Sequence, residues 1–143
     1  MQETLAATDS SICNFTSQWS CPSYWSPALG KQGRVAVLVK ENSCFKVLNW
    51  QKDSSGRIVT LLVKVKVDDA HFNLVNIYAP TNPTERKNFF VNCHEYFYPH
   101  CYQIIAGDFN CYESPNDKFG RNFTPYDLKE FRTTHSLADA SRY

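Results

Sequence analysis

The sequence lacks a long hydrophobic run, and this absence bears on where the protein resides. Its longest apolar stretch of note, Val35–Val39, is far too short to cross a bilayer, which takes about 20 apolar residues. The opening segment Met1–Thr4 has neither the basic nor the apolar region of a secretory signal. We therefore expect an intracellular protein, in the nucleus or the cytoplasm, that is neither secreted nor bound to a membrane.

Paired cysteines and a net charge are lacking as well. The six cysteines form no CxxC pair, so their spacing gives no zinc-site pattern, and we expect reduced thiols. The Asn-Phe-Thr sequons at Asn14 and Asn122 matter only in the secretory pathway. A formal net charge of +1 excludes no class of partner, because a near-neutral total can hide a basic patch beside an acidic site.

What is present is the composition of a globular protein. The 143 residues are 43% hydrophobic and 20% charged, which is typical of a folded chain and not of a disordered one. This length suffices for one compact domain with a real core. We expect a single domain over residues 1–143.

Strand patterns fill the middle of the chain. Residues 1–30 show no periodicity, since Pro22 and Pro27 interrupt them, and we expect them to be irregular. Valines alternate with lysines over Val63–Val67, the pattern of a half-buried strand. Short links between successive strands indicate an antiparallel meander. The predicted strands are Arg34–Val39, Phe45–Trp50, Arg57–Val67 and Phe72–Ile77.

Helix signals follow the strands. Asn82 suits a helix cap, Pro83 the first helical position and Glu85 the acid of a capping box, and Pro99 ends this helix. A short strand is predicted over Tyr102–Ala106. A second helix begins at Thr124-Pro125, with Asp127 at the capping position, and runs to about His135. One face of the first helix, which we expect to pack against a sheet, carries Phe89, Phe90, Cys93 and Phe97. The order of strands, helix, strand and helix indicates an α+β or layered α/β sandwich.

Polar residues that suit chemistry lie at the predicted strand ends. Gly107 lets the backbone bend after Ala106, and Asp108 and Asn110 lie two positions apart, so both can face one side. An acceptor and an amide donor converging there suit a water to be deprotonated and a phosphate oxygen to be held. Tyr78 places a phenol where the preceding strand ends. Glu3 supplies a carboxylate of the kind that holds magnesium.

Taken singly, each of these residues has a simpler structural explanation. A Gly-Asp-x-Asn run is most often an ordinary turn. Tyr78 alone fits a half-buried sheet aromatic, Glu3 a frayed terminal acid, and Asn82 a helix cap and not a ligand. Only the order of these features along one chain favours a shared site.

Taken together, the motifs resemble a known superfamily. They cover nearly the whole chain and comprise Gln2-Glu3-Thr4, Gly33–Leu38, Asn76–Pro80, Glu85-Arg86, Phe89-Phe90, Ile105–Asn110 and Leu137–Asp139 with Arg142. In this order they resemble the endonuclease/exonuclease/phosphatase (DNase I-like) superfamily. Within it, they are most similar to the apurinic-endonuclease-like nuclease domain of non-LTR (LINE-type) retrotransposons.

The resemblance implies a reaction and a role for each matching residue. It implies magnesium-dependent (or manganese-dependent) hydrolysis of one DNA strand, the nick then priming reverse transcription by the reverse transcriptase region of the same element. Glu3 matches the metal-binding glutamate, and Tyr78 the tyrosine that contacts the scissile phosphate. Asp108 matches the aspartate that orients or deprotonates the attacking water. Asn110 matches the asparagine that hydrogen-bonds the phosphate and the catalytic groups.

Parts of the superfamily pattern have no counterpart in the sequence. These are an asparagine-bearing strand before Gln2-Glu3-Thr4 and later strands with a Ser-Asp-His segment. We therefore expect a partial four-layer α/β (α+β) sandwich, a truncated domain lacking the N-terminal strand and the C-terminal strands. Such a sandwich exposes a sheet edge and cleaves DNA poorly. None of the histidines, which are His71, His94, His100 and His135, matches the catalytic one.

Two alternatives to a DNA-nicking enzyme stay open. One is a non-catalytic remnant that binds nucleic acid or a protein partner. The other is a phosphatase or phosphodiesterase of the same superfamily that acts on a small substrate. The sequence does not determine the target site or the oligomeric state.

Overall fold

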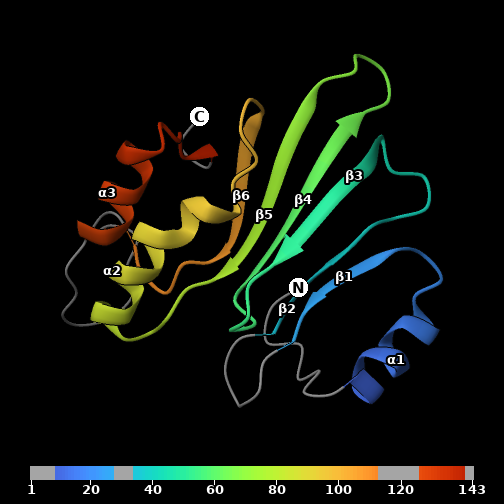
Figure 1. The fold of residues 1–143 in the computed structure, drawn as a ribbon, viewed down its shortest axis with the longest axis horizontal. Coiled ribbons are helices and arrows are strands. Elements are labelled where there is room, and N and C mark those ends of the chain that lie inside the picture. Colours follow the sequence, from blue (N-terminus) through green and yellow to red (C-terminus); the bar gives the residue numbers. More distant parts are fainter. Residues whose placement is uncertain (1–8, 28–33, 113–125, 141–143) are drawn as a thin grey trace. The chain divides into compact units, whose positions relative to one another are not determined.

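The computed structural model describes residues 9–27, 34–112 and 126–140 (Figure 1). The chain forms two compact units, one comprising residues 1–78 and 96–108 and the other residues 79–95 and 109–143. The expectation of a single domain over residues 1–143 stays a prediction. Within the described residues, no helix is long and apolar enough to cross a membrane.

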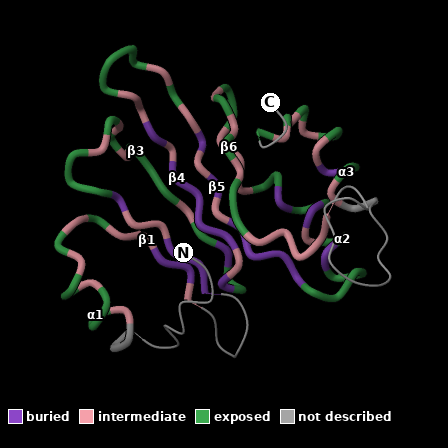
Figure 2. The backbone as a smooth tube through the Cα atoms, turned by 180° about the vertical axis from the view of Figure 1, so that it is seen from behind, coloured by how far each residue is buried: buried purple, intermediate pink, exposed green. Residues whose placement is uncertain are grey.

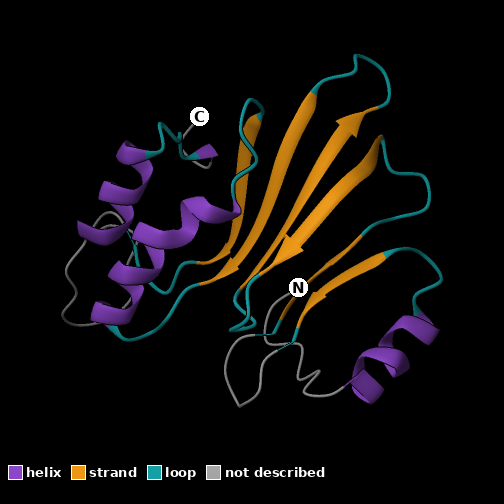
Figure 3. Cartoon of the chain, in the orientation of Figure 1, coloured by secondary structure: helices purple, strands orange, loops and turns teal. Residues whose placement is uncertain are grey.

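The first unit is built on a mixed four-stranded sheet (Figure 3). Its strand order is β3-β4-β5-β6, with β3, β4 and β5 antiparallel and β6 parallel to β5. The predicted meander is therefore confirmed for three strands, and the later predicted strand joins them as β6. The strands are β3 (Phe45–Lys52), β4 (Ile58–Val65), β5 (His71–Tyr78) and β6 (Tyr102–Asp108).

The first of the predicted strands belongs to a different sheet. It forms as β2 (Val35–Leu38) and pairs antiparallel with β1 (Ser23–Ser26) in a separate two-stranded sheet. The expectation that residues 1–30 are irregular is thus wrong in part, because this region contains β1 and the helix α1 (Asp9–Gln18). The cause is non-local. The segment around Trp25 becomes a strand by pairing with β2. The ring of Phe15 in α1 packs on the ring of Trp25, with centroids 5.8 Å apart.

The core of this unit lies between the two sheets. Val35 and Val39 join three residues of β4, Val59, Leu61 and Val63, in one buried cluster. Figure 2 shows the buried stretches running along β4 and β5. Apolar burial of this kind is the main force that holds two sheets face to face. Of the predicted alternation of valines and lysines, Val63 lies on the inner face of this small sandwich. Strand β4 ends at Val65, and Val67 is 90% exposed, so the alternation does not extend to Val67.

The same face is uncovered where it continues onto β6. Tyr102 and Ile104 pair with the core-facing Phe72 and Leu74 of β5, yet they are 71% and 48% exposed. Within the described residues β6 is also an edge strand of its sheet. Among the described residues, β6 is thus an edge strand with two exposed apolar side chains, while the expectation of a truncated domain stays a prediction.

A buried aspartate organises the turn between β3 and β4. Asp53 is 8% exposed, and its carboxylate accepts hydrogen bonds from the backbone N–H groups of Arg57 and Ile58, both at 2.8 Å. It also accepts from the hydroxyl of Ser26 on β1 at 2.9 Å. One side chain therefore stabilises the turn between β3 and β4 and links it to the two-stranded sheet.

Asp53→Ala is expected to lower the free energy of unfolding by about 2–4 kcal/mol, because several donors to a charged acceptor lose their partner together. Urea denaturation followed by circular dichroism measures this change. Asp68→Ala is the matched control, since Asp68 is exposed and, in the part of the chain that the structure describes, accepts only from the N–H of Ala70, at 3.1 Å. This substitution should change stability by no more than about 0.5 kcal/mol. Equal effects of the two substitutions would contradict the anchoring role of Asp53.

The second unit contains two helices. The predicted cap of α2 is confirmed, since the Asn82 side chain accepts from the N–H groups of Thr84 and Glu85 at 3.0 and 3.2 Å. The helix ends earlier than predicted, and a short 3₁₀ turn, η1, follows it in place of continued α-helix toward Pro99. The start predicted for the later helix at residues 124–125 lies outside the described residues. The elements are α2 (Pro83–Asn92), η1 (Cys93–Tyr96) and α3 (Tyr126–Thr134).

The buried side of α2 differs from the predicted one. Phe90 and Cys93 are buried as expected, at 4% and 1% exposure, but the third buried residue is the charged Arg86. Phe90 stacks on Phe131 of α3 with ring centroids 4.9 Å apart. The helices α2 and α3 therefore pack on each other. The expectation that α2 packs against a sheet stays a prediction.

Candidate functional site

The ends of β5 and β6 bring two of the expected site residues together. Tyr78 and Asp108 are direct partners in the parallel register of these strands. Neighbouring strands in a sheet lie about 4.8 Å apart, and paired positions direct their side chains to the same face. The phenol and the carboxylate therefore start from adjacent points on one face, at the end of both strands.

Tyr78 is held from two sides. Tyr78 is 6% exposed and belongs to the buried cluster between the two sheets. The guanidinium of Arg57 lies over its ring, 5.5 Å from the centroid. Arg57 Nη1 also donates to the Tyr78 carbonyl at 3.1 Å, and the backbone carbonyl of Arg57 accepts a hydrogen bond from the Tyr78 N–H at 2.9 Å. Sequence reasoning missed Arg57, because only the register of β4 against β5 shows that it lies beside Tyr78.

Asp108 follows a residue with unusual backbone geometry. Gly107 has φ 146°, a value that a side chain would oppose, so glycine is required there. Strand β6 nevertheless continues through Gly107 to Asp108, two residues beyond its predicted end, so the predicted bend after Ala106 does not end the strand. The side chain of Asp108 is half-buried.

Asn110 belongs to the second unit, and its backbone is not extended. Strand β6 ends at Asp108, and Asn110 has φ 48°, a left-handed value that asparagine tolerates better than most residues. Its amide Nδ2 donates to the carbonyl of Ala79 at 2.8 Å. Side chains alternate between the two faces only within the strand, and Asn110 lies beyond its end. The spacing of Asp108 and Asn110 therefore does not show that their side chains face the same side, as was predicted.

A buried arginine holds the segment that contains Asn110. Arg86 is fully buried, and its Nη1 donates to the carbonyls of Thr81 and Asn110 at 3.1 and 3.0 Å and to that of Pro80 at 3.4 Å. The guanidinium of Arg86 thus links the segment that follows Tyr-Ala-Pro, at Thr81, to the segment that follows Gly-Asp-Phe, at Asn110. The sequence offered a signal for this role, since Arg86 precedes Phe90 and Cys93 by one and two helical turns.

The residue expected to bind the metal, Glu3, lies outside the described residues. Among those described, no group of three or more His, Cys, Asp or Glu side chains is placed to hold an ion. Magnesium is commonly held by one or two carboxylates with water completing its shell. Carboxylate oxygens are the donors expected of Glu3, and Asp108 is a half-buried carboxylate at the end of β6.

Comparison with known proteins supports the fold. No family model matches the sequence. The crystal structure of truncated Caenorhabditis elegans TDP2 is similar with a TM-score of 0.52 and 19% identity, over 84% of this chain and 50% of that one. The human Nocturnin catalytic domain, solved with a bound sulfate anion, gives a TM-score of 0.49 and 15% identity, over 79% of this chain and 51% of that one.

The first of these likenesses concerns architecture alone. It confirms the predicted fold class, an α+β arrangement of the DNase I-like type with a mixed sheet and helices. The chain spans about half the length of the solved structures it matches.

Proposed function

We propose that this chain contributes part of a metal-dependent phosphodiesterase site that nicks DNA, as in the endonucleases of non-LTR retrotransposons. The observation that carries the proposal is the parallel register that pairs Tyr78 with Asp108 at the ends of β5 and β6. A phenol and a carboxylate side by side provide a hydrogen-bond donor for a phosphate oxygen and an acceptor for a water proton. The order of motifs in the sequence supplies the reaction class.

In this proposal each residue has one task. Asp108 accepts a proton from the attacking water or orients it, a role that suits a half-buried carboxylate. Tyr78 donates its hydroxyl to the scissile phosphate, with Arg57 holding its ring and backbone. Asn110 hydrogen-bonds the phosphate, the role that the resemblance implies for it.

A divalent ion completes the proposal. Glu3, which matches the metal-binding glutamate, would hold Mg²⁺ or Mn²⁺ through its carboxylate oxygens. When bound, the ion would neutralise charge on the phosphate and on the leaving oxygen. DNA is the proposed partner, together with the reverse transcriptase region of the same element, which would extend the nicked end.

Magnesium-dependent nicking of a supercoiled plasmid tests the proposal. Slow conversion to the open circle is expected with Mg²⁺ or Mn²⁺, and conversion should fall to the level of a no-protein control when EDTA is added. We expect the rate to be low, because Tyr78, Asp108 and Asn110 are only part of the catalytic set that the resemblance implies. Conversion that persists in EDTA would contradict the proposed metal dependence.

A second candidate function is DNA or partner binding without cleavage. It is favoured by the burial of Tyr78 in the core and by the bond that engages the Asn110 amide, both of which have a purely structural explanation. Fluorescence anisotropy with a labelled duplex discriminates the two. Binding in the presence of Mg²⁺ without any nick after prolonged incubation supports this candidate over the enzyme.

A further inference from the structure

Strand β3, which is the second edge strand of the four-stranded sheet among the described residues, combines an exposed aromatic ring with lysines (Figure 1). Trp50 is 41% exposed, although it pairs with the core residue Leu61 of β4. Two positions later, Lys52 directs its side chain to the same face of the sheet. Lys46 lies near the start of the strand, and Phe45–Lys52 contains no acidic residue. The strand therefore offers an aromatic surface beside positive charge.

The positive charge of β3 has no balancing acid in the part of the chain that the structure describes. Neither Lys46 nor Lys52 forms an ion pair or donates a hydrogen bond there. Lys46 lies directly opposite Lys64 of β4, and like charges at opposed positions repel each other. The carboxylate of Asp69 is engaged by Lys64, at 3.0 Å. Asp53, which follows the strand, is buried and accepts hydrogen bonds from other groups. The lysines of β3 therefore suit an anion from outside the chain.

The ring of Trp50 is held in place by a neighbouring aromatic ring. Tyr24 of β1 packs on it, with ring centroids 5.5 Å apart and ring planes inclined by 60°. An exposed indole whose position is fixed loses little freedom when a flat group stacks on it. Aromatic side chains of this kind are the platforms on which the bases of single-stranded nucleic acids stack.

The shape of β3 opposes the addition of another strand to the sheet. Its register against β4 shifts between Val47 and Asn49, where Leu48 is an extra residue. Such irregularities, together with lysines, are common means by which edge strands avoid pairing with further strands. Docking of a second sheet therefore does not account for the exposed ring of Trp50.

An aromatic ring beside lysines matches the two parts of a nucleic-acid strand. An unpaired base stacks on the ring, and an ammonium group binds a phosphate. Trp50 and Lys52 lie about 7 Å apart along the strand, so one nucleotide can contact both. We propose that the edge of β3 binds single-stranded DNA, with a base stacked on Trp50 and with Lys46 and Lys52 contacting phosphates. The choice of DNA rests on the proposed function, whereas the binding requires neither metal nor cleavage.

The β3 edge lies at the same end of the sheet as the proposed site. Lys52 pairs with Val59 of β4, and Val59 pairs with Asn76 of β5, two residues before Tyr78. Neighbouring strands are about 4.8 Å apart, so β3 lies roughly 10 Å from β5 and roughly 14 Å from β6 across the sheet. DNA bound along β3 is therefore held near Tyr78 and Asp108.

Fluorescence anisotropy with a labelled oligothymidylate tests this surface. EDTA is present throughout, so that no cleavage occurs. Trp50→Ala is expected to lower the affinity about 5- to 150-fold, the effect of losing one base stack. Lys46→Gln and Lys52→Gln should each reduce the slope of log K against log salt by about 0.7, the change for one phosphate contact of a single strand. A duplex of the same length should bind more weakly, because its paired bases are not free to stack.

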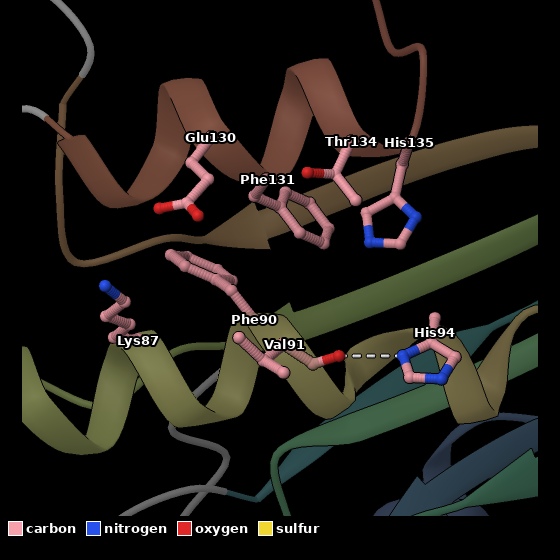
Figure 4. Close-up of a pocket in the computed structure, with 8 residues that line it drawn as sticks. All are labelled: Lys87, Phe90, Val91, His94, Glu130, Phe131, Thr134 and His135. Atoms are coloured by element: carbon pink, nitrogen blue, oxygen red, sulfur yellow. Dashed lines mark hydrogen bonds between the residues drawn. The ribbon is translucent and has the colours of Figure 1, made fainter.

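Matched controls come from the other edge strand and from the second unit. Tyr102 is 71% exposed on β6, and Tyr102–Asp108 contains no lysine or arginine, so Tyr102→Ala should bind like the wild type. Lys87 lines a cavity of about 590 Å³ between α2 and α3, where Glu130 faces the same space (Figure 4). Lys87→Gln should therefore keep the salt dependence of the wild type. Equal losses in Trp50→Ala and Tyr102→Ala, or an unchanged affinity in Trp50→Ala, would overturn the proposal.

Should Trp50→Ala not fold, NMR of the wild-type chain decides. The indole N–H signal of Trp50 should shift when the oligothymidylate is added. The signal of buried Trp25, whose Nε1 donates to the Ser23 hydroxyl at 2.9 Å, should not shift. An unshifted Trp50 signal would overturn the surface. The plasmid assay is separate, since nicking without oligonucleotide binding rejects the β3 surface alone, and binding without nicking rejects only the cleavage.

Discussion

Asp108→Asn is expected to reduce magnesium-dependent nicking by about 10²–10⁴-fold, the usual contribution of a group that takes a proton in the rate-limiting step. The substitution keeps the shape of the side chain and removes the charge and the basicity. Initial rates on a supercoiled plasmid, measured at saturating Mg²⁺, give the ratio. At the low rate proposed for the wild type, the variant should be indistinguishable from the control with EDTA.

The control for Asp108 is another aspartate at the surface of the same unit. Asp69 is 76% exposed and forms an ion pair with Lys64 at 3.0 Å, and Asp69→Asn should keep the wild-type rate. Both variants should match the wild type in circular dichroism and Tm, which separates a chemical effect from unfolding. Unchanged nicking in Asp108→Asn would remove Asp108 from the reaction and would attribute the cleavage to other groups.

Arg86→Met is expected to lower the free energy of unfolding by about 2–4 kcal/mol. Methionine approximates the aliphatic part of arginine but has no donor for the carbonyls of Pro80, Thr81 and Asn110. Buried carbonyls that lose a charged donor are costly, while the removal of a buried charge offsets part of that cost. Urea denaturation gives the change in midpoint, and hydrogen exchange of residues 79–95 shows whether the second unit is the part that opens.

A neighbouring substitution controls for the loss of positive charge. Lys87 follows Arg86 on the same helix but is exposed, so Lys87→Met should change stability by no more than about 0.5 kcal/mol. The same small change in Arg86→Met would show that its hydrogen bonds contribute little. A large loss of stability in Arg86→Met alone would establish that the guanidinium stabilises this segment through its hydrogen bonds.

Local signals in the sequence predicted the elements whose causes are local. The alternation around Val63 produced β4, and Asn82 with Pro83 located the start of α2 to the residue. The end of α2 was less accurate, because Cys93 continues the apolar face while the backbone there tightens into a 3₁₀ turn. Elements of this kind depend on propensity and capping, which a single sequence records.

Other features could not be predicted because their causes are distant in the chain. Strand β1 exists through its pairing with β2, and its Ser23–Ser26 segment has no alternation of its own. One charged residue was overlooked for a related reason. Arg57 looks like a surface residue in the sequence, and only its contacts with Tyr78 give it a role. The place of Arg86 on the apolar face of α2 was visible in the sequence, but its three carbonyl partners were not. The pairing of Tyr78 with Asp108 likewise depends on a parallel register that no turn specifies.

That parallel register also has a kinetic consequence. The hairpins β3-β4 and β4-β5 close over short turns, whereas β5 meets β6 through contacts such as Asn73 with Gln103, which are 30 positions apart. Contacts that close long loops form slowly, and parallel pairing is among the slowest. We expect a refolding chain to regain most of its circular dichroism before β6 docks. During that interval Tyr78 and Asp108 are not yet neighbours. The candidate site therefore forms only when β6 pairs with β5, in the last step of folding.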